Sequence, residues 1–397
     1  MAPRLGRARA LLRDGEGQGP RRVSRGAHPA ARPLGEDDVT ATRADRLEAT
    51  LEDAGVDVLF VSNLVNVRWL CGFTGSNAAA LVGAGRRVFI TDFRYLTQAA
   101  DQVGGGWEHR IAPELLVRAA EELAGAGPLR LGFDDAHLTV KQHARLAEKL
   151  PADVELVAAG GLVEELRATK DPDEIARIRA AAEVADAAFT EVILEGGIVG
   201  KTERAIALDL EIAMRRRGAE GVSFAPIIAA GPHGALPHAE PRDVAIPPNT
   251  LVVVDWGAQM DGYASDCTRT VATGELDGRD REVYELVLRA QEAALAAVRP
   301  GPTGREVDAV ARTIIDDAGH SEHFGHGLGH GVGMEVHEGP RLSKLGETPL
   351  EPGHVVTVEP GVYLPGAVGV RIEDLVVVTA DGADVLSGLS KALTVVA

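Results

Sequence analysis

The chain has few cysteines and no long uninterrupted hydrophobic run. Its 397 residues include only Cys71 and Cys267, which excludes a framework of disulfide bonds as the basis of the fold. Apolar runs such as 251–254 are cut by acidic residues well short of the ~18 residues that a membrane-spanning helix requires. We therefore expect no membrane span and a reducing compartment, for which the cytoplasm is the default.

Basic charge is also scarce. The chain holds 41 Lys and Arg against 59 Asp and Glu, and eight of the Arg lie in residues 1–32, leaving 33 basic against 57 acidic side chains after them. An acidic body repels the phosphates of nucleic acids and anionic lipids, so neither is expected as a partner. The whole chain is 45% hydrophobic and 25% charged, which is typical of a globular protein, and its length leaves room for two or three domains.

Residues 1–40 are rich in Arg, Gly, Pro and Ala and show no apolar period. Such a segment cannot bury enough apolar surface to offset the entropy of ordering, so we expect a disordered tail. Arg enrichment is also typical of organelle transit peptides, but Ser and Thr are scarce and the apolar core of a signal peptide is missing. A dispensable tail or an overlong start site is therefore the favoured interpretation.

Two domains are predicted to follow this tail. Residues 41–168 alternate short apolar runs with amphipathic helical stretches, which indicates an α/β domain. At Asp171 a capping acid is followed by Pro172 and Glu174, the pattern of a helix start, so a second domain is expected over 169–397.

The second region contains an internal repeat at a spacing of 104 residues. Segment 197–201 recurs as 301–305, and the strand-like segment 252–257 recurs as 356–361. Two copies related by a pseudo-twofold axis would bring Asp255 opposite Glu359. The pattern predicts an α+β domain built by duplication, and the alternative is a chance alignment of two hydrophobic strands that each end in an acid.

Two acidic residues flank a predicted hairpin in the first copy. A two-residue turn at 261–262 would pair Met260 with Tyr263 and make Asp255 and Asp266 diagonal neighbours on one face of the sheet. Two carboxylates on an apolar hairpin are costly to bury unless they meet a cation. Taken alone, the pair favours the simpler interpretation of solvated acids on an exposed strand face, because exposed acids are common.

The second copy supplies two further acids and an imidazole. Glu359 is followed fourteen residues later by Glu373, and strand alternation places Arg371 on the same face as Glu373. The Gly-rich segment 324–333, which contains His330, lets the backbone approach closely, although such a loop could be merely flexible. Four carboxylates and one imidazole form an oxygen-rich site whose charge balances two divalent cations, with Mn²⁺ preferred. A water bridging two such ions becomes a hydroxide nucleophile near neutral pH.

The segment His-Gly-Leu-Gly-His-Gly-Val-Gly-Met-Glu-Val-His, 326–337, together with these acids resembles the Xaa-Pro aminopeptidases and Xaa-Pro dipeptidases (prolidases), metallopeptidases of the pita-bread class. The region from Arg43, with segments 69–77 and 91–95, is similar to the creatinase-like N-terminal domain of that family, so the resemblance covers about nine tenths of the chain. It implies a creatinase-like domain before a pita-bread catalytic domain, two divalent ions (Mn²⁺, with Co²⁺ and Zn²⁺ as alternatives) and a homodimer.

The resemblance also implies roles for individual residues. The implied metal ligands are Asp255 on one ion, Asp266 and Glu373 bridging, and His330 and Glu359 on the other ion. The implied catalytic groups are His238 and His337 at the substrate carbonyl or tetrahedral intermediate, Glu359 as proton relay, and Arg371 and His326 as supports of the ligands.

This chemistry suits an unusual bond. The bond before proline is a tertiary amide without N–H, and its nitrogen must be protonated as it leaves. Two ions that polarise the carbonyl, and a carboxylate that carries the proton, meet both demands. We therefore expect a metal-dependent exopeptidase that cleaves Xaa-Pro bonds, either in dipeptides or at the amino terminus of peptides, and the motif residues do not choose between the two.

Three other functions are considered. A non-catalytic pseudo-peptidase that serves as a binding module, and a creatinase-like amidinohydrolase that works without metal, are disfavoured because all five ligand types are present. A methionine aminopeptidase would not need the large N-terminal region.

The segment 196–202 looks like a phosphate-binding loop, but Glu195 stands where that motif requires Gly. Cys267, which follows Asp266, is expected to point to the opposite face as a small core residue.

Overall fold

The computed structural model describes residues 42–396, so the expected tail at 1–40 lies outside the described residues. None of the helices within 42–396 combines the length and apolar character that crossing a membrane requires. The elements of the N-terminal region are α1 (Arg43–Leu51), β1 (Val58–Val61), α2 (Leu64–Cys71), β2 (Ala78–Gly83), β3 (Arg86–Thr91), η1 (Phe93–Tyr95), α3 (Leu96–Gln102), β4 (Glu108–Ile111), α4 (Leu115–Glu122), β5 (Leu129–Phe133), α5 (Val140–Lys149), β6 (Val154–Ala158) and α6 (Leu162–Ala168).

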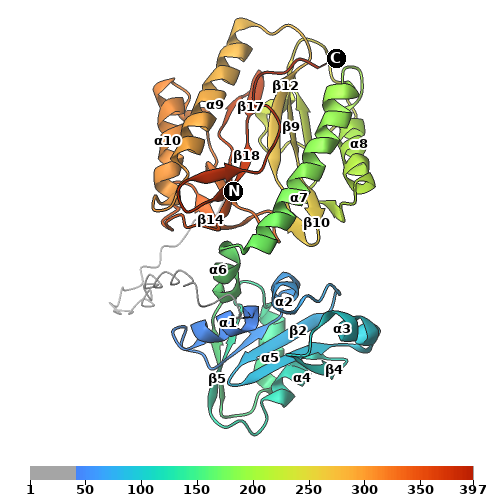
Figure 1. Ribbon diagram of the computed structural model, residues 1–397, viewed down its shortest axis with the longest axis vertical. Helices are drawn as coiled ribbons and strands as arrows, with labels where there is room; N and C mark the ends of the chain where they lie inside the picture. The colour runs from blue at the N-terminus through green and yellow to red at the C-terminus, as the bar shows by residue number, and fades with distance from the viewer. Residues whose placement is uncertain (1–41, 397) are drawn as a thin grey trace, which may run out of the picture. The chain divides into compact units, whose positions relative to one another are not determined.

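These elements form an α/β unit around one six-stranded sheet with the order β4-β3-β2-β1-β5-β6 (Figure 1). Strand β1 runs parallel to β5 and antiparallel to β2, and all its residues are buried. Strands covered on both faces are apolar throughout rather than alternating, which is why the short apolar runs were recognisable in the sequence. The predicted α/β class is confirmed.

The C-terminal region contains α7 (Pro172–Phe189), η2 (Thr190–Glu195), α8 (Glu203–Arg216), β7 (Gly221–Val222), β8 (Ile227–Ala230), η3 (Gly231–Ala235), β9 (Leu251–Trp256), β10 (Ala258–Met260), β11 (Tyr263–Ala264), β12 (Cys267–Ala272), α9 (Gly278–Ala297), α10 (Gly304–Asp317), η4 (Ser321–His323), β13 (Gly329–Gly331), β14 (Glu338–Leu342), β15 (Val355–Val358), β16 (Gly361–Leu364), β17 (Val368–Arg371), β18 (Asp374–Val378) and β19 (Ala383–Val385). Helix α7 begins with the predicted cap: the Asp171 side chain accepts from the Glu174 amide, and the Glu174 side chain accepts from the Asp171 amide.

Antiparallel strands fill the middle of this region, with α7 and α8 on one side and α9 and α10 on the other (Figure 1). The order β12-β9-β8 makes one sheet, and β14-β13-β15-β18-β19 makes another. One buried apolar cluster joins α7 and α8 to β8 and β9, and a second joins α9 and α10 to β15 and β18. Each helix pair therefore covers the strands of its own half of the domain.

The predicted hairpin is present in the expected register. Met260 pairs with Tyr263, and the two residues between them, Asp261 and Gly262, have φ of 48° and 82°. Two consecutive positive φ angles define the tight turn that matches the twist of the flanking strands, and the sequence Asp-Gly favours it. Cys267 is buried among apolar side chains, as expected.

The structure keeps part of the spacing of the predicted repeat, but the duplication and its pseudo-twofold axis stay predictions. Strands β9 and β15 begin 104 residues apart, with Asp255 inside β9 and Glu359 directly after β15. The capping residues of α8 and α10, Thr202 and Thr303, are 101 residues apart. The two halves therefore differ by three residues between the helix start and the strand.

We predict that Gly369→Ala destabilises the fold. A Cβ at Gly369 would overlap the carbonyl oxygen of Gly234, because β17 and η3 pack backbone to backbone there. The expected loss is about 1–3 kcal/mol in the free energy of unfolding, measured with urea. Gly382→Ala, where a Cβ meets open space, is the control. Equal losses in the two variants would contradict this packing.

Candidate metal centre

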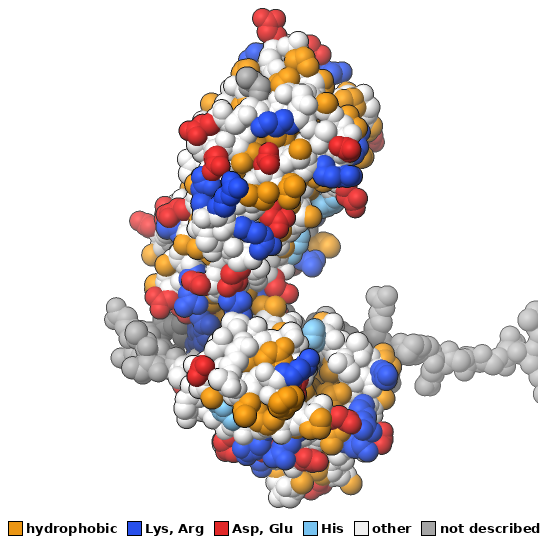
Figure 2. Space-filling view, turned by 90° about the vertical axis from the view of Figure 1, so that its right-hand side faces the viewer, with side chains coloured by type: hydrophobic (Ala, Val, Ile, Leu, Met, Phe, Trp, Pro, Cys, Tyr) orange, Lys and Arg blue, Asp and Glu red, His pale blue; other side chains and the backbone are white. Residues whose placement is uncertain are grey.

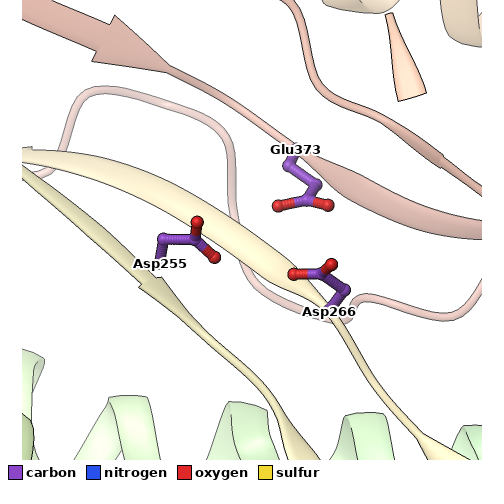
Figure 3. A group of neighbouring side chains, drawn as sticks. All are labelled: Asp255, Asp266 and Glu373. Atoms are coloured by element: carbon purple, nitrogen blue, oxygen red, sulfur yellow. The ribbon is translucent and has the colours of Figure 1, made fainter. Parts of the chain in front are cut away.

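Three carboxylates from separate strand ends point toward one another (Figure 3). Asp255 lies in β9, Asp266 directly precedes β12, and Glu373 lies between β17 and β18. One oxygen of each lies within 4.8 Å of the others, and all three residues are buried. This spacing allows the three oxygens to bind a common cation.

The strand register explains this convergence. Asp255 pairs with Thr268 across β9 and β12, which makes Asp266, two residues before Thr268, its diagonal neighbour. The Glu373 amide donates to the Thr268 carbonyl at 3.1 Å, and the Thr268 hydroxyl donates to the Glu373 carboxylate at 2.7 Å. Thr268 thus joins the second half of the domain to the first at the carboxylates.

His330 and Glu359 complete the group. His330 Nε2 lies 3.2 Å from Glu359 Oε1 and 3.7 Å from Asp266 Oδ2. Its other ring nitrogen, Nδ1, is 3.1 Å from the Gly331 carbonyl, which can only accept, so Nδ1 carries a hydrogen. This bond fixes the ring with Nε2 toward the carboxylates, the orientation that a metal-binding imidazole requires.

Two carboxylate oxygens in this group have no hydrogen-bond partner among the described residues. They are Asp255 Oδ1 and Glu373 Oε1, and both are inaccessible to solvent. Burial raises the pKa of Asp255, and it raises that of Asp266 and Glu373 strongly, with the neighbouring carboxylates adding to the effect. Unpartnered, buried and mutually repelling oxygens fit a site that binds cations.

Glu359 stays ionised in the same surroundings. Burial would raise its pKa, but the hydrogen bond with His330 and the positive charges of His330, His326 and Arg371 outweigh burial and set the pKa at about 2. The group therefore contains one carboxylate that keeps its charge and three that hold protons more readily.

The Arg371 guanidinium is buried beside the carboxylates. It donates to Asp255 Oδ2 at 2.6 Å and to the Tyr363 hydroxyl at 2.8 Å. The Tyr363 oxygen is 2.9 Å from His326 Nε2, and His326 Nδ1 is 2.7 Å from the Gly327 carbonyl. This chain of hydrogen bonds fixes the orientation of Asp255 and of the His326 ring.

A cavity of about 450 Å³ opens onto the carboxylates. The structure brings every predicted site residue to its wall, namely Asp255, Asp266, His330, Glu359, Glu373, His238, His337, Arg371 and His326. The ring centroids of His330 and His337 are 4.3 Å apart, and burial together with His330 lowers the pKa of His337. Apolar side chains, among them Phe224 and Ile227, line another part of the wall.

Three polar residues of the site were not predicted from the sequence. Thr268 and Tyr363 contact Glu373 and Arg371, and the Thr357 hydroxyl is 3.1 Å from both Glu359 Oε1 and the His330 amide. Thr268 and Thr357 lie in strands, each two residues from an acid at the adjoining strand end, so the alternation of an extended backbone could have identified them. Tyr363 is reached only through the pairing of β16 with β17, which the sequence pattern did not reveal.

Comparison with known proteins identifies the family. The profile described as metallopeptidase family M24 matches residues 176–380, and that of the creatinase/prolidase N-terminal domain matches residues 43–169. The chain belongs to metallopeptidase family M24. The predicted resemblance to the Xaa-Pro peptidases is therefore confirmed, as is the combination of a creatinase-like domain with a pita-bread domain.

Named relatives cover nearly the whole described chain. An uncharacterized peptidase of Bacillus subtilis, YqhT, is 41% identical over 86% of this chain and 96% of the relative's length. The Xaa-Pro dipeptidase of Pyrococcus furiosus is 35% identical over 88% of this chain and 99% of the relative's length. Among solved structures, the Xaa-Pro dipeptidase from Bacillus anthracis has a TM-score of 0.85 at 38% identity, covering 89% of this chain and 99% of its own. The X-Pro aminopeptidase from Thermotoga maritima has a TM-score of 0.81 at 35% identity, and the match covers 89% of this chain and 100% of that structure's chain.

We predict that this M24 peptidase releases protons when it binds metal. Asp266 and Glu373 have raised pKa values in the metal-free fold, so a divalent ion must displace protons from them, and affinity for Mn²⁺ falls as the pH is lowered from about 8 to about 6. For the same reason, rising pH destabilises the metal-free fold by charging these carboxyls, and bound cations reverse that loss.

Titration calorimetry in two buffers of different ionisation enthalpy measures the released protons. Asp266→Asn removes one of these carboxyls and is expected to bind Mn²⁺ more weakly and with fewer protons released. Asp209→Asn, at an exposed position on α8, is the matched control and is expected to bind Mn²⁺ like the unmodified protein. An affinity for Mn²⁺ independent of pH would contradict the prediction.

Proposed function

We propose that this M24 peptidase hydrolyses the bond between an amino-terminal residue and proline, with Xaa-Pro dipeptides as the first candidate substrates. The observation that carries the proposal is the convergence on one cavity of four carboxylates and an imidazole, side chains of the types that bind metals, two of them with unpartnered buried oxygens. The name Xaa-Pro dipeptidase, borne by relatives such as that of Pyrococcus furiosus, supports the choice of substrate.

The donor set fits two divalent ions. Asp255, Asp266, Glu373, Glu359 and His330 would hold them, and four carboxylates with a single imidazole favour Mn²⁺, with Co²⁺ and Zn²⁺ as alternatives. Bound there, the ions would activate water for attack and polarise the carbonyl of the bond to be cleaved.

The side chains around the ligands would supply proton transfer and orientation. Glu359, ionised at neutral pH, would accept a proton from the attacking water and deliver it to the departing proline nitrogen. His238 and His337, on the cavity wall, would position the carbonyl oxygen and stabilise the charge that develops on it. Arg371 would hold Asp255 in place through their 2.6 Å contact.

An Xaa-Pro aminopeptidase that acts on longer peptides is the second candidate, supported by the similarity to the enzyme from Thermotoga maritima.

The non-catalytic module and the metal-free amidinohydrolase are disfavoured, since the buried acids of this site have too few positive partners of their own. On the face in Figure 2, Lys and Arg side chains are mixed with Asp and Glu, so the described residues on this face show no continuous basic patch of the kind that binds nucleic acids. A cytoplasmic homodimer, expected from cysteine scarcity and resemblance, remains part of the proposal.

We predict that metal-stripped protein regains hydrolysis of an Xaa-Pro dipeptide when Mn²⁺ is added, and that the corresponding Xaa-Ala dipeptide is cleaved far more slowly. Liberated proline is measured, and the tripeptide Xaa-Pro-Xaa is assayed in parallel to separate dipeptidase from aminopeptidase activity. Failure to cleave either proline peptide with Mn²⁺, Co²⁺ or Zn²⁺ would refute the proposal and favour the non-catalytic module.

Ligand variants give a second prediction. Asp255→Ala and His330→Ala are expected to lower kcat/KM by more than about a hundredfold, because each removes a group that would hold the ions. His323→Ala is the matched control for His330→Ala, since His323 lies on η4 and does not line the cavity. Unchanged hydrolysis in either ligand variant would show that the metal centre is not where the reaction occurs.

A further inference from the structure

We propose that Glu203, together with Arg242, positions His238 for the reaction. Neither residue lines the cavity, and neither belongs to the predicted site. The inference rests on the proposed function, because it concerns how one of the cavity-wall imidazoles is held. It assigns a task to an ion pair that the reaction itself does not use, in which the Glu203 carboxylate is buried and the Arg242 guanidinium is partly exposed.

Glu203 is the first residue of α8, and its side chain is 1% exposed. Its carboxylate accepts from the Ala230 amide at 3.0 Å, the Arg242 amide at 2.9 Å and His233 Nδ1 at 3.0 Å. The Arg242 guanidinium donates to both carboxylate oxygens, each at 3.0 Å. A single buried carboxylate thus gathers groups that lie 27 to 39 residues further along the chain.

These contacts close a loop. Ala230 ends β8 and Arg242 lies twelve residues later, and His238 is within the segment 231–241 between them. Backbone bonds reinforce the closure, since the Arg204 amide donates to the Arg242 carbonyl at 3.1 Å. Glu203 therefore holds both ends of the loop that carries His238 to the cavity.

The opposite side of the loop is held from within the site. Arg371 Nη1 donates to the carbonyl of Pro237, the residue before His238, at 3.2 Å. With Arg371 beside the cavity and Glu203 behind the loop, the backbone at His238 is fixed between two buried side chains. Loss of either contact frees one side of the loop.

The charge of Glu203 matters for this closure. Burial would raise its pKa, but the Arg242 guanidinium, the two amides and His233 outweigh burial and keep the pKa below its ordinary value. An ionised carboxylate satisfies all these donors at once, and a neutral amide in its place presents one acceptor oxygen and two hydrogens. Substitution by Gln therefore leaves buried donors unpaired and loosens the loop.

Kinetics of Glu203→Gln with an Xaa-Pro dipeptide and Mn²⁺ test the proposal. We expect kcat to fall by about tenfold to a hundredfold through misplacement of His238, with KM and the number of bound Mn²⁺ ions per chain nearly unchanged. Glu211→Gln, which removes an exposed ion pair with Arg215 on the same helix, is the control and is expected to match the unmodified enzyme. Arg242→Lys keeps the charge without the two-pronged contact, and serves if Glu203→Gln fails to fold.

A double-mutant cycle separates positioning from general support of the fold. If Glu203 acts through His238, then adding Glu203→Gln to His238→Ala lowers kcat by less than about twofold. Hydrogen exchange of the amides in 231–241 is also expected to be faster in Glu203→Gln. Multiplicative effects of the two substitutions, or faster exchange with unchanged kcat, would overturn the inference. The proposed function fails separately, if the unmodified enzyme cleaves no Xaa-Pro peptide.

Discussion

Burying several carboxylates close together costs free energy, and the C-terminal region must offset this cost to keep its fold. Asp255, Asp266 and Glu373 lie within 4.8 Å of one another through one oxygen each, and Glu359 approaches the same group through His330. Arg371 neutralises only part of this charge, and two oxygens remain without a partner among the described residues. A protein can maintain such repulsion only if a cation, or bound protons in its place, offsets it.

The architecture of the C-terminal region serves this convergence. Each helix pair covers the strands of its own half, and the acids lie where the two halves meet at β12 and the junction of β17 with β18. The five proposed ligands lie within strands or directly at strand ends, whereas His238 and His337 lie in loops. In the proposed reaction, the strands would fix the groups that hold the ions, while His238 would depend on supports such as the Glu203–Arg242 pair.

Local features were predictable from the sequence because their causes lie within a few residues. The cap at Asp171, the turn at 261–262 and the pairing of Met260 with Tyr263 follow from short-range rules, and all three are confirmed. The carboxylates of both halves could be grouped because an internal spacing and a family resemblance related them. The roles given to the individual ligands stay predictions.

Contacts between distant segments could not be predicted in the same way. The bond between Tyr363 and His326 depends on a strand pairing without a distinctive pattern, and Glu203 meets Arg242 across 39 residues. Neither contact has a periodic or compositional signal, because each arises from how whole elements pack. Long-range polar contacts of this kind are therefore the part of the site that only the structure supplies.

The most direct test of the account is to soak crystals of the protein in Mn²⁺ and to measure anomalous scattering at the manganese absorption edge. The account predicts two peaks per chain, about 3.5–4 Å apart, enclosed by Asp255, Asp266, His330, Glu359 and Glu373. The absence of anomalous density among these side chains, or its appearance only elsewhere on the protein, would contradict the account.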